Sequence, residues 1–167
     1  QLNELLSNTA EMTGFHDSLK EKGRHMITGV SGSVRTLLLA DLEEKFQVPL
    51  IVVCDDLFHA QSLEEDLTNV FAEEDIDLFP VEENFAAAIS ASSPEYKAQR
   101  VKTLQKMADG SSKIVVTSVS GIRRMLCPKD FWLKSTIKFK LGEEIIPEKL
   151  KQELCTMGYR AVKMVER

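Results

Sequence analysis

The stretch Pro49–Cys54, with the sequence PLIVVC, is a continuous apolar run typical of a strand buried on both faces of a parallel sheet. A second run of this kind, KIVVT, occupies Lys113–Thr117. Between the two runs the sequence predicts a helix over Asp55–Phe71, a short strand over Ile76–Phe79 and a helix from Pro94 to about Asp109. Strands that alternate with helices of these lengths form βαβ units. We therefore predict an α/β fold with a mostly parallel sheet and helices on both faces.

The chain before the first run continues the same alternation. Residues Thr9–Lys22 read as a helix that Gly23 ends, His25–Thr28 as a short strand, and Arg35–Phe46 as a helix. The segment 82–92 is compatible with either a helical turn or a loop.

The chain after the second run is less regular. We predict short helices over Ser120–Leu126 and Pro128–Lys134 and a strand over Thr136–Lys140. From Gly142 a new unit begins, with a helix over Pro147–Met157 and a strand over Tyr159–Val165. We therefore expect one domain over residues 1–141 and the start of a small second α/β domain over 142–167. The second segment is too small to fold alone, and the chain lacks an initiator Met, so we expect a piece of a longer protein.

Composition places the chain among soluble globular proteins. Its 167 residues are 43% hydrophobic and 28% charged, which excludes collagen and a fully disordered chain. No apolar run approaches the ~20 residues of a membrane helix, and no signal peptide is visible, so we expect a cytoplasmic protein. The cysteines have no C-x-x-C spacing and form no zinc pattern with the histidines, so we expect reduced structural thiols and no metal. These residues are Cys54, Cys127, Cys155, His16, His25 and His59.

Charge is divided along the chain. The net charge is −5, yet Phe46–Tyr96 contains 12 acidic residues and no Lys or Arg, whereas Lys97–Arg167 carries +9. This division is compatible with solvated helix faces, or with a bipolar surface that orients a partner or a neighbouring domain. The overall acidity argues against a free-standing module that binds duplex DNA.

A loop between a predicted strand and a predicted helix resembles a phosphate-binding loop. The pattern G-x-x-x-x-G-K-[ST] places its key positions on Gly29, Val34, Arg35 and Thr36, with Gly32 and Ser33 inside the loop. Val34 adds side-chain bulk where a glycine lets the backbone wrap a phosphate, and Arg35 replaces a slimmer lysine. Thr36 could still hold Mg²⁺, so three readings stay open: a nucleotide site, a vestigial loop and a chance resemblance. We expect no bound cofactor.

Two further groups are candidates for chemistry. Asp55 and Asp56 follow a buried strand, where a carboxylate could bind Mg²⁺ or cap the next helix. A basic group surrounds Phe131 and Trp132 and could contact DNA or another domain, or form a solvated face over an apolar anchor. Its members are Arg123, Arg124, Lys129 and Lys134. No residue is predicted to be catalytic.

The order of segments resembles the N-terminal, UvrB-like region of the bacterial transcription-repair coupling factors (Mfd) over nearly the whole chain. In UvrB the loop reads close to G-V-T-G-S-G-K-T, and here it is Gly29–Thr36 (GVSGSVRT). Val115–Ile122 (VVTSVSGI) is similar to the UvrB segment V-V-A-S-V-S-C-I-Y, and Ile51–Leu67 to a helicase-like strand and helix. The segment Ser92–Arg100 and the triplet Leu126–Pro128 resemble Gram-positive members.

The resemblance implies a RecA-like sheet of the P-loop NTPase type and a large ATP-driven DNA translocase. That translocase displaces stalled RNA polymerase at lesions and recruits UvrA for nucleotide excision repair. Its UvrB-like module has lost its ATP site, and ATP and Mg²⁺ act in distant motor domains. The partners implied are therefore UvrA, the motor domains of the same chain, RNA polymerase and DNA. The main UvrA contacts are expected beyond Arg167.

Two other interpretations stay open. The retained Gly29, Gly32 and Thr36 are compatible with an atypical P-loop ATPase that uses Arg35 and Thr36. The second of these is a small stand-alone regulator that has the same fold.

Overall fold

The computed structural model describes residues 9–81 and 93–162. The chain divides into two compact units, which meet in sequence between Leu126 and Cys127. The predicted domain boundary at Gly142 lies inside the second unit and stays a prediction. No helix in the described part of the chain is long and apolar enough to cross a membrane.

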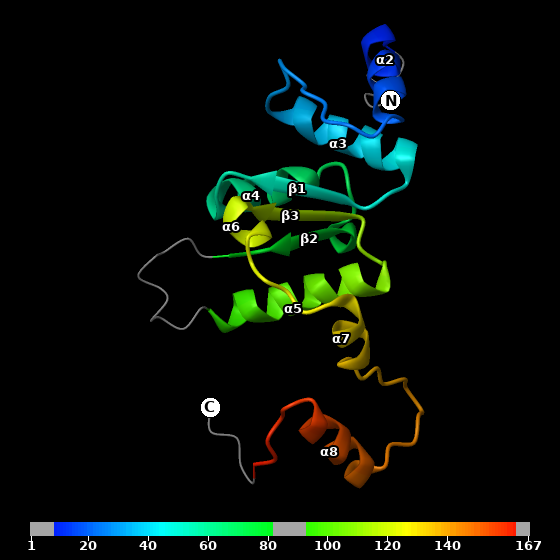
Figure 1. Cartoon of the computed structure of the whole chain (residues 1–167), viewed down its shortest axis with the longest axis vertical. Coiled ribbons are helices and arrows are strands. Elements are labelled where there is room, and N and C mark those ends of the chain that lie inside the picture. The colour runs from blue at the N-terminus through cyan, green and yellow to red at the C-terminus, as the bar shows by residue number, and fades with distance from the viewer. Residues whose placement is uncertain (1–8, 82–92, 163–167) are drawn as a thin grey trace. The chain divides into compact units, whose positions relative to one another are not determined.

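The first unit is a parallel sheet surrounded by helices (Figure 1). Its strands lie in the order β1-β3-β2, and β3 pairs in parallel with both neighbours. Because parallel neighbours need a crossover, each strand is followed by a helix or by a segment that leads to one. The elements in chain order are α2 (Ala10–Leu19), α3 (Ser33–Phe46), β1 (Leu50–Cys54), α4 (Leu57–Leu67), a 3₁₀ turn η1 (Glu73–Asp75), β2 (Ile76–Phe79), α5 (Pro94–Asp109), β3 (Ile114–Ser118) and α6 (Val119–Ile122). The predicted α/β fold is therefore confirmed.

The core lies between α4 and one face of the sheet. Ala60, Leu63 and Leu67 of α4 are fully buried against alternate residues of the strands. Ile114 and Val116 of the central strand are also fully buried. This face joins residues that are far apart in sequence, so the sheet and α4 form one cooperative core.

The opposite face of the sheet is covered unevenly. Gly121 of α6 lies against Thr117 and Phe79, and a Cβ at this position would collide with the Thr117 hydroxyl. On β1, by contrast, Ile51 and Val53 are 58% and 43% exposed. The prediction that Pro49–Cys54 is buried on both faces is therefore wrong. Helix α4 covers one face of β1, while the other face stays open.

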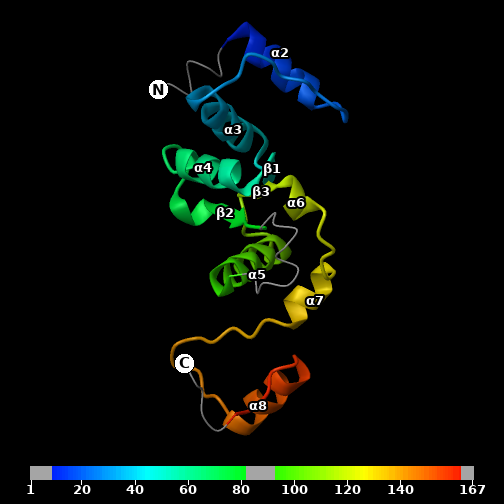
Figure 2. The same ribbon diagram turned by 90° about the vertical axis from the view of Figure 1, so that its left-hand side faces the viewer.

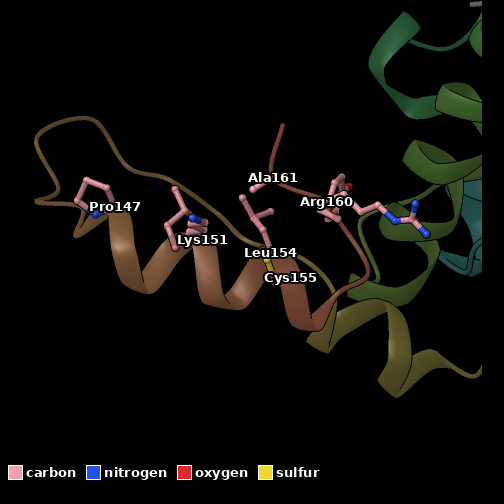
Figure 3. Close-up of a pocket in the computed structure, with 8 residues that line it drawn as sticks. Pro147, Lys151, Leu154, Cys155, Arg160 and Ala161 are labelled. Atoms are coloured by element: carbon pink, nitrogen blue, oxygen red, sulfur yellow. The ribbon is translucent and has the colours of Figure 1, made fainter. Parts of the chain in front are cut away.

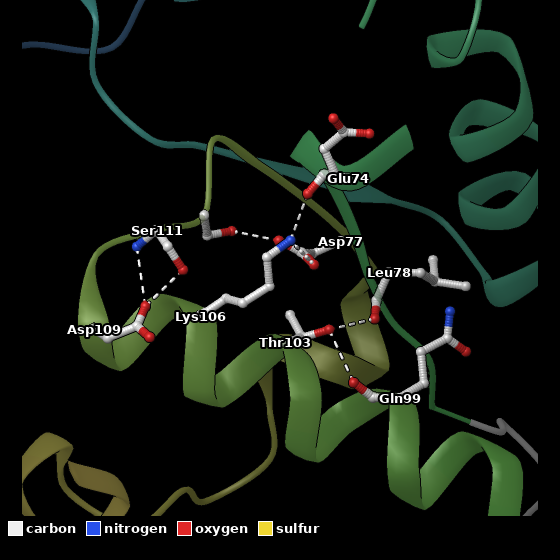
Figure 4. Close-up of polar contacts among 9 residues, drawn as sticks. Glu74, Asp77, Leu78, Gln99, Thr103, Lys106, Asp109 and Ser111 are labelled. Atoms are coloured by element: carbon white, nitrogen blue, oxygen red, sulfur yellow. Dashed lines mark hydrogen bonds and ion pairs between the residues drawn. The ribbon is translucent and has the colours of Figure 1, made fainter. Parts of the chain in front are cut away.

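Helix α5 is joined to β2 by polar contacts (Figure 4). The Lys106 ammonium lies 2.7 Å from Asp77 Oδ1 and donates to the Glu74 carbonyl, while the Ser112 hydroxyl donates to Asp77 Oδ2. The Thr103 hydroxyl donates to the Leu78 carbonyl at 2.7 Å. Asp77, which is 4% exposed, is thus fully engaged, as a buried carboxylate must be.

Several predicted helix ends are confirmed. The Ser93 side chain accepts from the Glu95 N–H, Pro94 begins α5, and Gly110 ends it in the left-handed region with φ +79°. Helix α2 begins after Thr9, whose side chain accepts from the Met12 N–H. These three helix ends follow the usual capping chemistry.

Three predicted strands are wrong wherever the structure describes them. Residues 25–28, 136–140 and 159–162 have no strand pairing, and the rest of the third segment lies outside the described residues. An apolar sequence forms a strand only when another strand accepts its backbone hydrogen bonds. The segment 82–92, for which the sequence left two alternatives, also lies outside the described residues.

The second unit contains the helices α7 (Lys129–Lys134) and α8 (Pro147–Thr156), both visible in Figure 2. Pro147 begins α8, and the helix ends before Gly158, whose φ is +94°. Between the helices a turn at Gly142 is closed by a hydrogen bond from the Glu143 N–H to the Lys140 carbonyl. The predicted helix in this region is confirmed to within one residue of its end.

Candidate functional site

The phosphate-loop-like segment keeps the backbone conformation that its glycines predict. Gly29 and Gly32 have φ values of +79° and +53°, in the region that favours glycine. Gly32 is the N-cap of α3, and its carbonyl accepts from the Arg35 N–H at 3.0 Å. The Val34 N–H donates to the Ser31 carbonyl at 3.3 Å. The turn that leads into α3 is therefore closed by its own backbone.

The side chains of the segment present a different chemistry from that of a phosphate site. Thr36 is 4% exposed, and its hydroxyl donates to the Ser33 carbonyl at 2.8 Å. Val34 is 45% exposed. At the start of α3 the hydroxyl is thus directed to the helix backbone, and an apolar side chain faces the open side.

A cavity of about 350 Å³ lies between α2, the loop and the first turns of α3. Seven of its ten lining residues are apolar or carry a thioether, so it offers few groups to an anion. The lining residues are Thr9, Glu11, Met12, Phe15, Met26, Ile27, Thr28, Val30, Val34 and Leu38.

The charged residue of the loop lies near the end of β1. Arg35 is exposed, and its positive charge opposes burial, which raises the pKa of the Cys54 thiol. Burial has the larger effect, so the pKa of Cys54 is raised on balance, with Asp55 and Asp56 acting in the same direction. Cys54 is therefore an ordinary thiol with little thiolate at neutral pH, as the sequence indicated.

Asp56 acts as a helix cap. Its carboxylate accepts from the His59 N–H and lies 2.8 Å from His59 Nδ1. The backbone hydrogen bond from His59 is the main reason that the pKa of Asp56 is lowered. The capping alternative is thus the one that the structure shows. In residues 9–81 and 93–162 no group of three or more His, Cys, Asp or Glu side chains could hold a metal ion.

The predicted basic group is divided between the two units. Arg123 and Arg124 follow α6 in the first unit, whereas Lys129 and Lys134 bound α7 in the second. All four side chains are exposed, and Phe131 meets Trp132 edge-to-face at 6.0 Å between ring centres. That the four charges form one interaction surface stays a prediction.

Sequence reasoning missed two features. One is the buried pair of His16 on α2 and Asp41 on α3, whose Nε2 and Oδ2 atoms lie 2.5 Å apart. Nothing in the sequence links two residues that are 25 positions apart.

The other feature is a cavity of about 210 Å³ beside α8, shown in Figure 3. The apolar spacing of Leu150 and Leu154 was an available sequence signal for it. Its lining residues are Pro147, Leu150, Lys151, Leu154, Cys155, Tyr159, Arg160 and Ala161.

Sequence comparisons identify relatives of the chain. No protein-family model matches it. It is 33% identical over 154 residues to a transcription-repair-coupling factor of Bacillus subtilis (strain 168), a match that covers 92% of this chain and 13% of that protein. It is 25% identical over 140 residues to the factor of Staphylococcus aureus (strain USA300), with 84% and 12% covered. The factor of Staphylococcus haemolyticus (strain JCSC1435) is 26% identical over 140 residues, with the same coverage.

The matched proteins agree in name, and each aligns with most of this chain. The chain spans 12–13% of their length, so it corresponds to one segment of those proteins. The resemblance seen in the sequence motifs is confirmed by these matches. The chain belongs to the transcription-repair-coupling factor family.

Proposed function

We propose that this chain is the N-terminal, non-catalytic, UvrB-like module of a transcription-repair-coupling factor. In this proposal the whole protein is an ATP-driven DNA translocase that displaces stalled RNA polymerase, with ATP and Mg²⁺ bound by motor domains elsewhere in its chain. The module helps to recruit UvrA and to restrain those motor domains. Family membership and the 12–13% coverage support a role as one part of such a machine.

The observation that carries the proposal is the chemistry of the loop at the start of α3. A phosphate-binding loop presents backbone N–H groups and a cationic side chain to the ligand, and a hydroxyl to Mg²⁺. Here Val34 faces the open side, and the Thr36 hydroxyl is buried and donates to Ser33. A nucleotide would lose the contacts that normally hold its phosphates.

Calorimetric titration with Mg-ATP and Mg-ADP tests this proposal. We expect no saturable heat from the wild-type chain at millimolar nucleotide. A Val34→Gly, Arg35→Lys double variant is the matched comparison, because it restores the glycine and the lysine of the loop pattern. Saturable wild-type binding that is lost in Thr36→Ala would overturn the non-catalytic assignment.

The alternative function is an atypical P-loop ATPase that uses Arg35 and Thr36. The positive φ values of Gly29 and Gly32 favour it, because the loop keeps the turn that wraps a phosphate. The titration separates the two functions. If the wild-type chain hydrolyses ATP and Thr36→Ala abolishes this activity, the ATPase becomes the better supported of the two functions.

The role in UvrA recruitment needs a separate test. A small second domain that begins near Gly142 would carry the UvrA-binding surface, with its main contacts beyond Arg167. We expect immobilised UvrA to bind a full-length factor at least tenfold more tightly than this chain. Equal affinities would show that residues 1–167 already hold the whole binding surface.

A further inference from the structure

Helix α2 covers one side of α3. Val34, Leu38 and Asp41 lie on α3 at helical spacing, and the first two line the cavity opposite Met12 and Phe15 of α2. Figure 2 shows α2 beside α3, on the side away from the sheet. The contact between α2 and α3 is thus apolar near Val34 and Leu38 and polar near Asp41.

The polar end holds a buried pair of ionisable groups. His16 Nε2 and Asp41 Oδ2 are 2.5 Å apart, and their side chains are only 6% and 4% exposed. The His16 ring also meets Phe46 of α3 edge-on, with 6.1 Å between ring centres. Only one arrangement of the two helices makes this buried contact, so the pair favours one docked position of α2.

The apolar end is packed incompletely. The cavity of about 350 Å³ separates Met12 and Phe15 from Val34 and Leu38. Among the ten residues of α2, all of which the structure describes, His16 alone is buried. The core cluster consists of residues from α4 and the strands, with Leu39 of α3 packed against it. Segments with few buried apolar contacts open locally at low free-energy cost while the core stays folded.

We infer that α2 is a strap that opens and closes over the first turns of α3, and that the His16–Asp41 pair is its latch. Residues 20–32 connect the two helices and can span about 40 Å when extended, which is enough to release α2 as a unit. Opening uncovers Leu38, which is 8% exposed, beside Val34, Met26 and Ile27, which are already exposed. Opening therefore enlarges the exposed apolar surface at the start of α3, whether or not the loop binds nucleotide.

Hydrogen exchange of the 167-residue chain, followed by mass spectrometry, tests the latch. In the wild type we expect the amides of Thr13–Leu19 to exchange faster than those of Ile114–Ser118 in β3. His16→Gln and Asp41→Asn should each speed exchange in α2 by about tenfold or more, because either change breaks the buried pair. Exchange in β3 should stay unchanged.

Two further variants separate a latch from general helix stability. Asp17→Asn is the matched control, because Asp17 precedes Lys20 on the same helix and pairs with it in an exposed position. It should leave α2 exchange within about twofold of the wild type. The double variant His16→Leu, Asp41→Leu should restore protection, because an apolar pair can replace a buried polar one.

Three outcomes would overturn the inference. Exchange in α2 as slow as in β3 would show that α2 does not open independently. Unchanged α2 exchange in both single variants would show that the pair is not a latch. Equal acceleration in α2 and β3 would show that the pair supports the whole unit rather than the strap.

Discussion

The two compact units differ in what they bury. In the first, α4 and the sheet enclose fully buried residues such as Leu63, Leu67 and Val116. In the second, none of residues 127–162 is buried to a comparable degree, and Leu141 is fully exposed. Phe131 and Leu133 of α7 are also exposed, as are Ile145 and Ile146 just before α8. Because burial of apolar surface is the dominant favourable contribution to folding, most of the stability of this chain resides in the first unit.

The largest expected effect comes from emptying the core of the first unit. Leu63→Ala should lower the free energy of unfolding by about 3–5 kcal/mol, because Leu63 is fully buried and its loss leaves a cavity. Leu154→Ala on α8 is the matched change in the second unit and should cost less than about 1 kcal/mol. Urea unfolding followed by circular dichroism measures both. Equal costs would show that the two units are stabilised alike.

A smaller effect is expected at the polar contact between α5 and β2. Asp77→Ala should cost about 2–3 kcal/mol, because it leaves Lys106 and Ser112 without their buried acceptor. Asp75→Ala breaks the more exposed pair with Lys113 and should shift the urea midpoint much less. If the two variants unfold at the same urea concentration, burial does not govern the strength of these pairs.

Thiol reactivity distinguishes the two units without changing the sequence. Burial raises the pKa of Cys54 in the first unit, whereas Cys127 and Cys155 of the second unit are exposed. Iodoacetamide at pH 8 should therefore modify Cys127 and Cys155 roughly tenfold faster than Cys54. Mass spectrometry of the alkylated peptides gives the rates, and unfolding in guanidinium should make them equal. Faster reaction at Cys54 in the folded chain would contradict the burial of β1 against α4.

The smallest expected effect is a pH dependence at Glu64 of α4. Burial raises the pKa of Glu64 above its ordinary value of 4.5, and Glu65, Asp77 and Glu73 act in the same direction. Folding therefore favours the protonated form of Glu64. Below pH 4.5 the side chain is protonated in the folded and the unfolded chain, so it costs no stability. As the pH rises from 4.5 through the folded pKa, the unfolded chain loses this proton first, and the folded state is increasingly destabilised. Glu64→Gln should raise thermal stability at pH 7 and have little effect at pH 4. The opposite pH trend would show that the carboxylate is favourably paired.

Local features of the sequence determined where most elements lie. The runs at Pro49–Cys54 and Lys113–Thr117 form β1 and β3, and Ser93, Pro94 and Gly110 mark the ends of α5. These features act through neighbouring backbone groups, so they are readable before the chain folds. The phosphate-loop-like turn was readable for the same reason, because Gly29 and Gly32 permit positive φ.

Tertiary structure decided what depends on distant residues. The packing of α4 on one face of the sheet left the other face of β1 open, so that Ile51 and Val53 stay exposed. Residues 25–28 and 136–140 have strand-like sequences but no pairing partner in the described structure, and a strand without a partner leaves its backbone hydrogen bonds unmade. The His16–Asp41 pair joins positions 25 residues apart. A sequence specifies each residue's chemistry, whereas only the folded chain determines which groups meet and which are excluded from water.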